Sequence, residues 1–478
     1  MDIIWVNPYT TAVARYGPLA KSGVFFPPLG IGYLAAISRE SNFKTYILDC
    51  EGLNLNIEKA AKEIIEYSPK YLGLTSTTMT IHDAASLAKL VKDNCKDIII
   101  LIGGPHLSAV PQETMNLFPQ FDIGVIGEGE LTVKELLSYL ESGDELSSVQ
   151  GIIWRKNGNL IINSPRPFIE DLDKVPFPAW DLFPDLTRYY RPSVFGFKNL
   201  PAAPIITSRG CLGKCSFCDK SVYDSRVRFH GPGYIISQIE YLKSTYGIKE
   251  IVIYDDEFVG NRKRIIDFCE ILRKRRMNIT WSANARADLV DLELLKIMKE
   301  AGCWCLSYGI ESGSQEILDF MQKDESLEQI SRAIKWSKKA KIKCKGYFMI
   351  GSLTETKQSI IETERFILNS DLDIVTINHF TPFPNTVDYN RANKYGKFKK
   401  DWRLLNQHNL VFVPRGLTAR EIEDAIRKTI KRFYFRPRSL FTFAKLIIYP
   451  KILFIGFFSI LKVIFKKISL SAKIKESN

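Results

Sequence analysis

Short apolar runs rich in β-branched residues alternate with amphipathic helical patterns in the first third of the chain. Helical patterns such as 57–67 and 83–92 separate the runs. The alternation of strand and helix predicts an α/β fold over residues 1–140, with a parallel, doubly wound sheet of the flavodoxin-like type. The runs cover residues 3–7, 46–50, 71–76, 97–104 and 123–127.

Glycines gather where these predicted strands end. In a doubly wound sheet, ligands bind beyond the carboxyl ends of the strands. Turns and helix starts alone would explain any one pair, but the whole set favours a bound ligand at this edge. The glycines are Gly30, Gly32, Gly103, Gly104, Gly127 and Gly129.

Residues 141–200 differ in character and predict an interdomain connector. A hairpin is expected around the Asn157-Gly158 turn, because that dipeptide is typical of two-residue hairpin loops. A proline-rich stretch follows through Pro176, Pro178 and Pro184.

A second alternation of strands and helices runs through residues 201–390. Six strand-helix units predict a partial (β/α)6 barrel, whose chemistry would lie at the carboxyl ends of its strands. Residues 391–440 predict a helical extension, with a helix at 418–434 that starts at Thr418 and has Glu421 as capping-box partner. The barrel strands are expected at 204–208, 250–255, 279–284, 304–310, 345–351 and 374–380.

The net charge of +13 is concentrated at one end of the 478 residues. Eleven Lys and Arg against one Glu follow residue 430, so the rest of the chain is close to neutral and does not predict a nucleic-acid partner. Nine cysteines in a chain that opens on a strand-like run predict a reducing cytoplasm.

The basic tail, residues 441–478, is also apolar. Its uncharged stretch 452–461 is only ten residues long, well short of the roughly 20 that span a bilayer. We expect a helix in the membrane interface, peripheral to the inner face, with its basic residues toward anionic headgroups. The alternative is a helix docked on the protein's own surface.

The sharpest motif is Cys211-Leu-Gly-Lys-Cys215-Ser-Phe-Cys218, directly after the first expected barrel strand. Three thiolates on one short loop suit a soft metal centre, either zinc or an iron–sulfur cluster. Structural zinc would need a fourth ligand, whereas a four-iron cluster held by three cysteines keeps one iron open to a small molecule. A zinc knuckle and three unrelated thiols are the alternatives.

This motif, with Phe217 before its last cysteine, resembles the signature of the radical S-adenosylmethionine (SAM) enzymes. The chain is more narrowly similar to the cobalamin-binding branch of that superfamily, in which a doubly wound cobalamin domain precedes the barrel. The resemblance rests on further motifs in the same order, at residues 27–34, 103–106, 127–130, 254–258 and 309–314.

For the barrel, the resemblance implies a 4Fe-4S cluster on Cys211, Cys215 and Cys218 and a SAM site around it. One carboxylate of the 255–257 run would hold the methionine amine, Glu311 would bind the ribose, and Phe217 would contact adenine. Arg286 would meet the methionine carboxylate, or else form a salt bridge to Asp288 or to a neighbouring strand. The carboxylates in question are Asp255, Asp256 and Glu257.

For the first domain, the resemblance implies a corrin on the strand ends. The chain lacks an Asp-x-His-x-x-Gly pattern, so the cobalt is expected to have no lower histidine ligand. His82 and His106 are expected to be hydrogen-bonding or exposed groups. The implied contact residues are Thr75, Ser76, Gly103, Gly104, Gly127, Glu128 and Gly129.

The reaction implied is methylation of an unactivated carbon. A reducing partner such as flavodoxin or ferredoxin would supply the electron that cleaves SAM to a 5′-deoxyadenosyl radical, and cobalamin would carry the methyl group. The substrate is expected to be a small or lipid-like molecule. Alternatives are cyclisation, ring contraction or carbon–carbon coupling without methyl transfer, and, in another class, a non-catalytic cobalamin or redox sensor.

Overall fold

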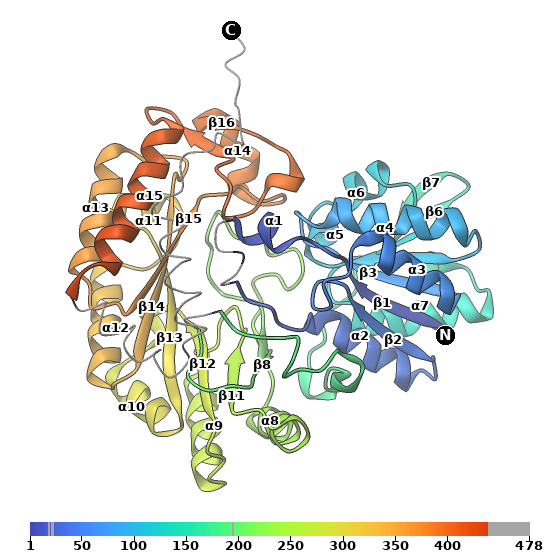
Figure 1. Ribbon diagram of the computed structural model, residues 1–478, viewed down its shortest axis with the longest axis horizontal. Helices are drawn as coiled ribbons and strands as arrows, with labels where there is room; N and C mark the ends of the chain where they lie inside the picture. The colour runs from blue at the N-terminus through green and yellow to red at the C-terminus, as the bar shows by residue number, and fades with distance from the viewer. Residues whose placement is uncertain (18–19, 21–22, 194–195, 438–478) are drawn as a thin grey trace.

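The computed structural model describes residues 1–437 except 18, 19, 21, 22, 194 and 195. Two β-sheets, each with helices packed against it, lie side by side (Figure 1). The tail predicted at 441–478 lies outside the described residues.

The first sheet has the order β2-β1-β3-β4-β5-β6-β7. Its first five strands are parallel and follow the flavodoxin order, which confirms the predicted doubly wound sheet. They are β1 (Ile3–Asn7), β2 (Thr45–Asp49), β3 (Tyr71–Thr75), β4 (Ile99–Gly103) and β5 (Ile123–Val125).

Helices cover both faces of this sheet. Side chains that alternate along β1 point to opposite faces, so Ile3 and Trp5 join one hydrophobic cluster and Ile4 and Val6 another. Side chains of α2 (Leu29–Glu40) and α7 (Glu130–Ser142) pack in the first cluster, and side chains of α3 (Ile57–Tyr67) and α4 (Ile81–Asn94) pack in the second. Shorter helices are α1 (Ala12–Tyr16), α5 (Pro105–Ala109) and α6 (Pro111–Leu117).

The predicted hairpin, β6 (Ile152–Lys156) and β7 (Asn159–Ile162), does not stand apart in a connector. It extends the first sheet, because β6 pairs antiparallel with β5. Asn157 and Gly158 both have positive φ, 50° and 81°, as a two-residue hairpin turn requires.

The second sheet confirms the partial barrel. Its six strands are all parallel and lie in chain order, β8-β11-β12-β13-β14-β15, and the connecting helices cover its outer face (Figure 1). The strands are β8 (Ala202–Ile205), β11 (Glu250–Ile253), β12 (Thr280–Ala285), β13 (Cys303–Glu311), β14 (Lys343–Ile350) and β15 (Ile374–His379). The helices are α8 (Pro232–Tyr246), α9 (Arg262–Lys274), α10 (Leu292–Glu300), α11 (Gln315–Phe320), α12 (Leu327–Lys339) and α13 (Lys357–Asn369).

The C-terminal extension is only partly helical. Helix α14 (Val387–Tyr395) leads into a small antiparallel sheet of β16 (Gly396–Phe398) and β17 (Phe412–Pro414). Helix α15 (Ala419–Tyr434) follows, and the predicted capping box of Thr418 and Glu421 is present.

The segment between β16 and β17 returns to the first sheet. Trp402, Leu405 and Val411 belong to the same hydrophobic cluster as helices α3 and α4. In the part of the chain that the structure describes, no helix is both long and apolar enough to cross a membrane.

Candidate functional site

The cysteine loop, residues 210–227, projects from the carboxyl end of the first barrel strand. Two short antiparallel strands, β9 (Ser208–Arg209) and β10 (Arg228–Phe229), form its stem. Gly210 makes the turn possible because its φ is 89° and a Cβ atom there would lie 2.3 Å from the carbonyl oxygen of Arg226.

Two of the three cysteine sulfurs flank Gly213. A Cβ atom at that position would lie 3.4 Å from Cys211 Sγ and 3.7 Å from Cys215 Sγ. The Gly213 N–H donates to Cys211 Sγ at 3.4 Å, an interaction of the kind that tunes iron–sulfur clusters. All three cysteines are free thiols, and Cys218 is the most exposed.

The loop is anchored at its middle by the barrel. The Ser216 N–H donates to the Met321 carbonyl at 2.9 Å, and the Ser216 carbonyl accepts from the Asp388 N–H at 3.2 Å. Arg391 donates to Ser216 Oγ at 3.2 Å, and the Lys220 ammonium donates to the Gly213 carbonyl. These contacts hold the loop through Ser216 and Lys220 rather than through the thiols, although Cys218 Sγ makes a long contact of 3.8 Å with the Asp219 carbonyl.

The loop fits a cluster better than a single metal ion. Among the described residues, no three Cys, His, Asp or Glu side chains converge as ligands of one ion. A four-iron cluster instead binds each cysteine to a different iron, so its ligands surround a larger object. Three free thiols on one anchored loop, two of them around a glycine, match that requirement.

The three candidate carboxylates after β11 differ in their surroundings. Asp255 accepts hydrogen bonds from the Thr207 N–H at 2.6 Å, from Thr207 Oγ1 at 2.5 Å and from Ser208 Oγ at 2.7 Å. It is 2% exposed and serves to join β11 to the end of β8. Both Asp255 oxygens are thus engaged within the barrel, which makes Asp255 a poorer candidate for the methionine amine than its two neighbours.

Glu257 is the carboxylate that lacks a side-chain partner. It is 1% exposed, and within the described residues no side chain hydrogen-bonds to either carboxylate oxygen. The backbone N–H of Val259 approaches the carboxylate and favours its charged form. Burial raises its pKa to about 7, although the charge of Arg286 opposes the shift. Asp256, in contrast, is exposed. A buried carboxylate without a side-chain partner suits a cationic ligand.

Glu311 ends β13 at a bulge and has a φ of 66°. Burial raises its pKa to about 7, and the Lys323 charge opposes this. Lys323 itself forms a buried salt bridge with Glu325 at 2.9 Å. Sequence reasoning missed this pair, because nothing in the run 323–325 signals that it folds back beside the strand end.

Arg286 forms the salt bridge to Asp288 that was one of its two expected roles. Two of its nitrogens lie 3.0 Å from the two oxygens of Asp288. Its Nη1 atom points to the cysteine loop, 3.0 Å from where a Cβ atom at Gly213 would lie. Phe217 is half-buried and packs against the apolar cluster that contains Met349 and Phe380.

The loops expected to contact the corrin are brought together at one edge of the first sheet. Gly104 has a φ of 96°, and a Cβ atom there would lie 2.7 Å from the Ser76 carbonyl and 2.8 Å from Thr75 Oγ1. The Ser76 N–H donates to the Gly103 carbonyl at 3.0 Å. Gly127, after β5, donates its N–H to Ser108 Oγ at 3.0 Å.

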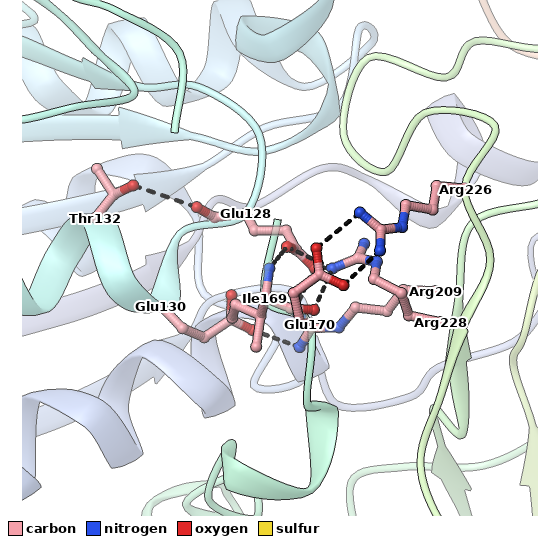
Figure 2. A network of polar contacts seen from close by, with 8 residues as sticks. All are labelled: Glu128, Glu130, Thr132, Ile169, Glu170, Arg209, Arg226 and Arg228. Atoms are coloured by element: carbon pink, nitrogen blue, oxygen red, sulfur yellow. Dashed lines mark hydrogen bonds and ion pairs between the residues drawn. The ribbon is translucent and has the colours of Figure 1, made fainter. Parts of the chain in front are cut away.

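Glu128 differs from that expectation, because the barrel engages its carboxylate. Arg209 and Arg228 donate to it at 2.8–2.9 Å, and the Ile169 N–H donates at 2.9 Å (Figure 2). Burial works to raise the pKa of Glu128, but the two arginines outweigh it and hold that pKa below its ordinary value. Sequence reasoning missed both arginines, although Arg209 directly precedes Gly210.

The two loop histidines are hydrogen-bonding or packing groups. His106 Nδ1 lies 3.2 Å from Thr78 Oγ1, and its ring packs edge-on against Trp402 with centroids 4.3 Å apart. Burial lowers the pKa of His106 to about 3, so the imidazole is neutral at neutral pH. His82 packs against Phe118.

Comparison with known protein families agrees with this geometry. Residues 205–367 match the radical SAM superfamily, and residues 17–137 match the B12 binding domain. The first match covers the cysteine loop and the four barrel strands β11 to β14, and the second covers the loops at the edge of the first sheet. The fold and the site thus define a radical SAM enzyme with a B12-binding domain.

Sequence similarity to individual proteins gives a more specific assignment within this superfamily. The chain is 35% identical over 443 residues to the "uncharacterized methyltransferase PH0819" of Pyrococcus horikoshii, covering 92% of this chain and 94% of that protein. It is 26% identical over 445 residues to the anaerobic magnesium-protoporphyrin IX monomethyl ester cyclase of Cereibacter sphaeroides, covering 91% and 71%.

A solved structure shares the fold. It is that of the cobalamin-dependent SAM radical enzyme OxsB with aqua-cobalamin and SAM bound, with a TM-score of 0.75, 19% identity, and 96% of this chain and 72% of that one covered. With the identity to the Pyrococcus protein, these matches show that the chain belongs to the cobalamin-dependent radical SAM methyltransferase family. Its cofactors are a 4Fe-4S cluster, SAM and cobalamin, and the sensor alternative loses its support.

Proposed function

We propose that this protein methylates an unactivated carbon of a small molecule. The observation that carries the proposal is that the cysteine loop at the carboxyl end of the first barrel strand is tied by Arg209 directly to the β5–α7 loop of the B12-binding domain. One rigid contact thus holds the two cofactor regions together, as a reaction that uses both of them requires.

When bound, the cluster and SAM supply the radical that takes a hydrogen atom from carbon, and cobalamin supplies the methyl group. The chain's own residues bind and orient. Cys211, Cys215 and Cys218 would hold the cluster, and the anchored Ser216 fixes the loop that carries them. Exclusion of water and oxygen falls to the surrounding barrel.

Glu257 is our choice for the methionine amine, because a buried carboxylate gains most from a cationic partner. Asp256 is the accessible alternative. Glu311 would accept hydrogen bonds from the ribose hydroxyls, and Arg286 would meet the methionine carboxylate through Nη1 while Asp288 holds its other nitrogens. Phe217 would contact the adenine.

For cobalamin, we propose a surface made by the loops after β3, β4 and β5. Gly104 and Gly127 allow a close backbone approach there, with φ values of 96° and 75°. Thr75 and Ser76 supply hydroxyl groups, and Gly103 and Gly129 complete the loops. We also propose that this domain includes the hairpin β6–β7, because the hairpin continues its sheet.

The coproducts of the reaction test the proposal. The anaerobically reconstituted full chain, given SAM, a chemical reductant and extracts as a substrate source, should form both 5′-deoxyadenosine and S-adenosylhomocysteine. Cys215→Ala should abolish 5′-deoxyadenosine, whereas Cys95→Ser, which changes a half-buried cysteine at the end of α4, should not. Substrate-dependent 5′-deoxyadenosine without S-adenosylhomocysteine would refute methylation.

Formation of 5′-deoxyadenosine without S-adenosylhomocysteine would favour the cyclase-type alternative, which the 26% identity to the Cereibacter cyclase supports. Cyclisation, ring contraction and carbon–carbon coupling need no methyl donor. Mass spectra of lipids and small molecules from cells with and without the gene would separate the reactions. A methylating enzyme should leave a precursor lighter by one methylene when the gene is absent.

We further propose that the enzyme works in the cytoplasm at the inner face of the membrane, reduced by a flavodoxin or ferredoxin. The support is the composition of residues 441–478, which combine apolar side chains with many lysines. The full chain should float with vesicles that contain an anionic phospholipid, and a chain ending at residue 440 should not. Equal flotation of both chains would exclude the tail as the anchor, and would remove the support that the tail gives to a lipid-like substrate.

A further inference from the structure

The stem of the cysteine loop carries two arginines at opposite positions. In the antiparallel pair β9–β10, Arg209 is directly across from Arg228. Both side chains are buried, with 2% and 4% of their surface exposed. Like charges at opposite positions of a strand pair repel, and burial removes the water that would screen them. The stem therefore needs an anionic partner.

Glu128 is that partner. Its Oε1 atom accepts from Nη1 of both arginines, at 2.8 Å from Arg209 and 2.9 Å from Arg228, while Oε2 accepts from Arg228 at 2.8 Å. Glu130 balances the remaining charge by accepting from Arg209 Nη2 at 2.5 Å. Figure 2 shows the four side chains converging from separate segments of the chain. All four are at least nine-tenths buried.

The two sides of this cluster belong to different halves of the protein. Glu128 and Glu130 lie in the β5–α7 segment, at the edge of the B12-binding domain, whereas Arg209 is two residues before Cys211. The contact is extended by two tyrosines. The Arg209 guanidinium lies 5.5 Å from the ring centroid of Tyr33 in α2 and 5.7 Å from that of Tyr223 in the cysteine loop.

We propose that Glu128 is a positioning residue that couples the B12-binding domain to the cysteine loop. The stem closes fully only when Glu128 bridges both arginines, with Glu130 balancing the second positive charge. Binding that orders the β5–α7 loop therefore orders the cysteine loop as well, and by reciprocity a loaded cysteine loop favours binding at the first domain. This inference rests on the proposed function, because it assigns the ligand of the first domain to cobalamin.

Hydrogen exchange of residues 211–227 tests the coupling in the metal-free full chain, so the readout does not depend on activity. In the wild type, saturating hydroxocobalamin should slow exchange of this segment by about tenfold. The slowing should be absent in Glu128→Gln, which keeps the size of the side chain but loses its charge. Glu170→Gln is the matched control, because Glu170 pairs with Arg226 of the same loop but both are exposed, at 63% and 58%.

A residue that only stabilised the fold would change exchange equally with and without hydroxocobalamin. Slowing that persists in Glu128→Gln at the wild-type size would therefore overturn the proposal, and so would its absence from a wild type that binds hydroxocobalamin. Should Glu128→Gln fail to fold, Glu128→Asp decides the matter. Its shorter side chain keeps the charge but not the reach to both arginines, so full slowing there would equally overturn the coupling.

Failure of the proposed function is distinguishable from failure of this inference. If absorption titration shows that the wild-type chain binds no hydroxocobalamin, the cobalamin assignment falls. The hydrogen exchange of residues 211–227 in the ligand-free chain then tests only whether Glu128 holds the cysteine loop in place. Faster exchange in Glu128→Gln but not in Glu170→Gln supports it, and equal rates in all three chains refute it.

Discussion

Gly309 lies directly beside the carboxylate of Glu311, because a Cβ atom at position 309 would lie 2.7 Å from Glu311 Oε1. The bulge in β13 creates this approach, and Glu311 adopts a φ of 66° there. That conformation is uncommon for a residue with a side chain, so the surrounding barrel holds it in place. The direction of the Glu311 carboxylate is therefore set by the backbone of the strand.

Gly309→Ala should displace the Glu311 side chain and weaken SAM binding. The carboxylate is the flexible end of the Glu311 side chain and can move aside, so the fold should tolerate the change. The displaced carboxylate would lose its hydrogen bonds to SAM, and we expect a loss of roughly tenfold in affinity. Equilibrium dialysis with SAM on the reconstituted chain measures it. Gly30→Ala is the control, because no atom lies within 4 Å of a Cβ atom there. Unchanged SAM affinity in Gly309→Ala would exclude Glu311 from the SAM site.

Glu257→Gln should stabilise the ligand-free protein above neutral pH while it weakens SAM binding. The folded-state pKa of Glu257 is raised from 4.5 to about 7 by burial, so in the wild type its ionisation lowers stability as pH rises through that window. Removing the carboxylate should remove a penalty of roughly 1–3 kcal/mol that is complete above about pH 7.

Thermal denaturation of the metal-free wild type and Glu257→Gln, between about pH 5 and about pH 8, checks this sign. The melting temperatures should converge at the acid end and diverge at the alkaline end, with the variant higher. Asp256→Asn is the companion variant, because Asp256 is the adjacent carboxylate and is exposed, so it shows whether the effect depends on Glu257 itself. Desolvation and the charge of Asp255 raise the pKa of Asp256 as well. Parallel curves for the wild type and Glu257→Gln would show that Glu257 is not an isolated buried carboxylate.

Gly210→Ala should prevent the cysteine loop from closing. The new Cβ atom would lie 2.3 Å from the carbonyl oxygen of Arg226, a backbone atom that cannot rotate away, and the φ of 89° adds strain. We expect iron and sulfide content after anaerobic reconstitution to fall by more than half. Gly233→Ala, at the start of α8 with open space around it, should reconstitute fully. Full iron loading of Gly210→Ala would show that the cluster assembles even when the β9–β10 stem is not closed, and would contradict this prediction.

Trp402→Ala should destabilise the protein by about 3–5 kcal/mol, because the side chain is 6% exposed and packs on the first domain. Loss of the indole ring should also expose His106 to water, and its pKa, which burial lowers to about 3, should rise. A histidine with a lowered folded-state pKa costs stability as pH falls below its unfolded value near 6.5. The variant should therefore lose less stability on acidification than the wild type, as urea titrations at two pH values would show. Trp402→Phe should retain most of the stability.

Both sheets could be predicted from the sequence because each strand is a largely apolar run that ends in, or within two residues of, a glycine or a polar residue. The run at 3–7 coincides with β1, and the barrel strands lie within a few residues of their predicted positions. The position of the hairpin in the sequence could be predicted, but the strand with which it pairs could not. Pairing with β5 depends on which edge of the sheet is free, and local sequence carries no information about that.

The cysteine motif could be located in the same way, since its spacing is local. The hydrogen-bond and ion-pair partners of the residues around the motif could not be predicted. Glu128 and Asp255 both look like ligand-binding carboxylates in sequence, yet each is engaged by arginine or hydroxyl groups from a distant segment. Their motifs show where a carboxylate is needed, whereas only the fold shows whether it faces a ligand or another part of the chain.

The return of residues 402–411 to the first domain has a consequence for how the protein is made. On the ribosome, the doubly wound sheet emerges first, but the surface covered by Trp402, Leu405 and Val411 stays bare until the whole barrel has been synthesised. The N-terminal domain is therefore finished last, although it is translated first. A fragment that ends before the barrel would keep an apolar face open to water, and an expression strategy for this enzyme has to keep both ends of the chain together.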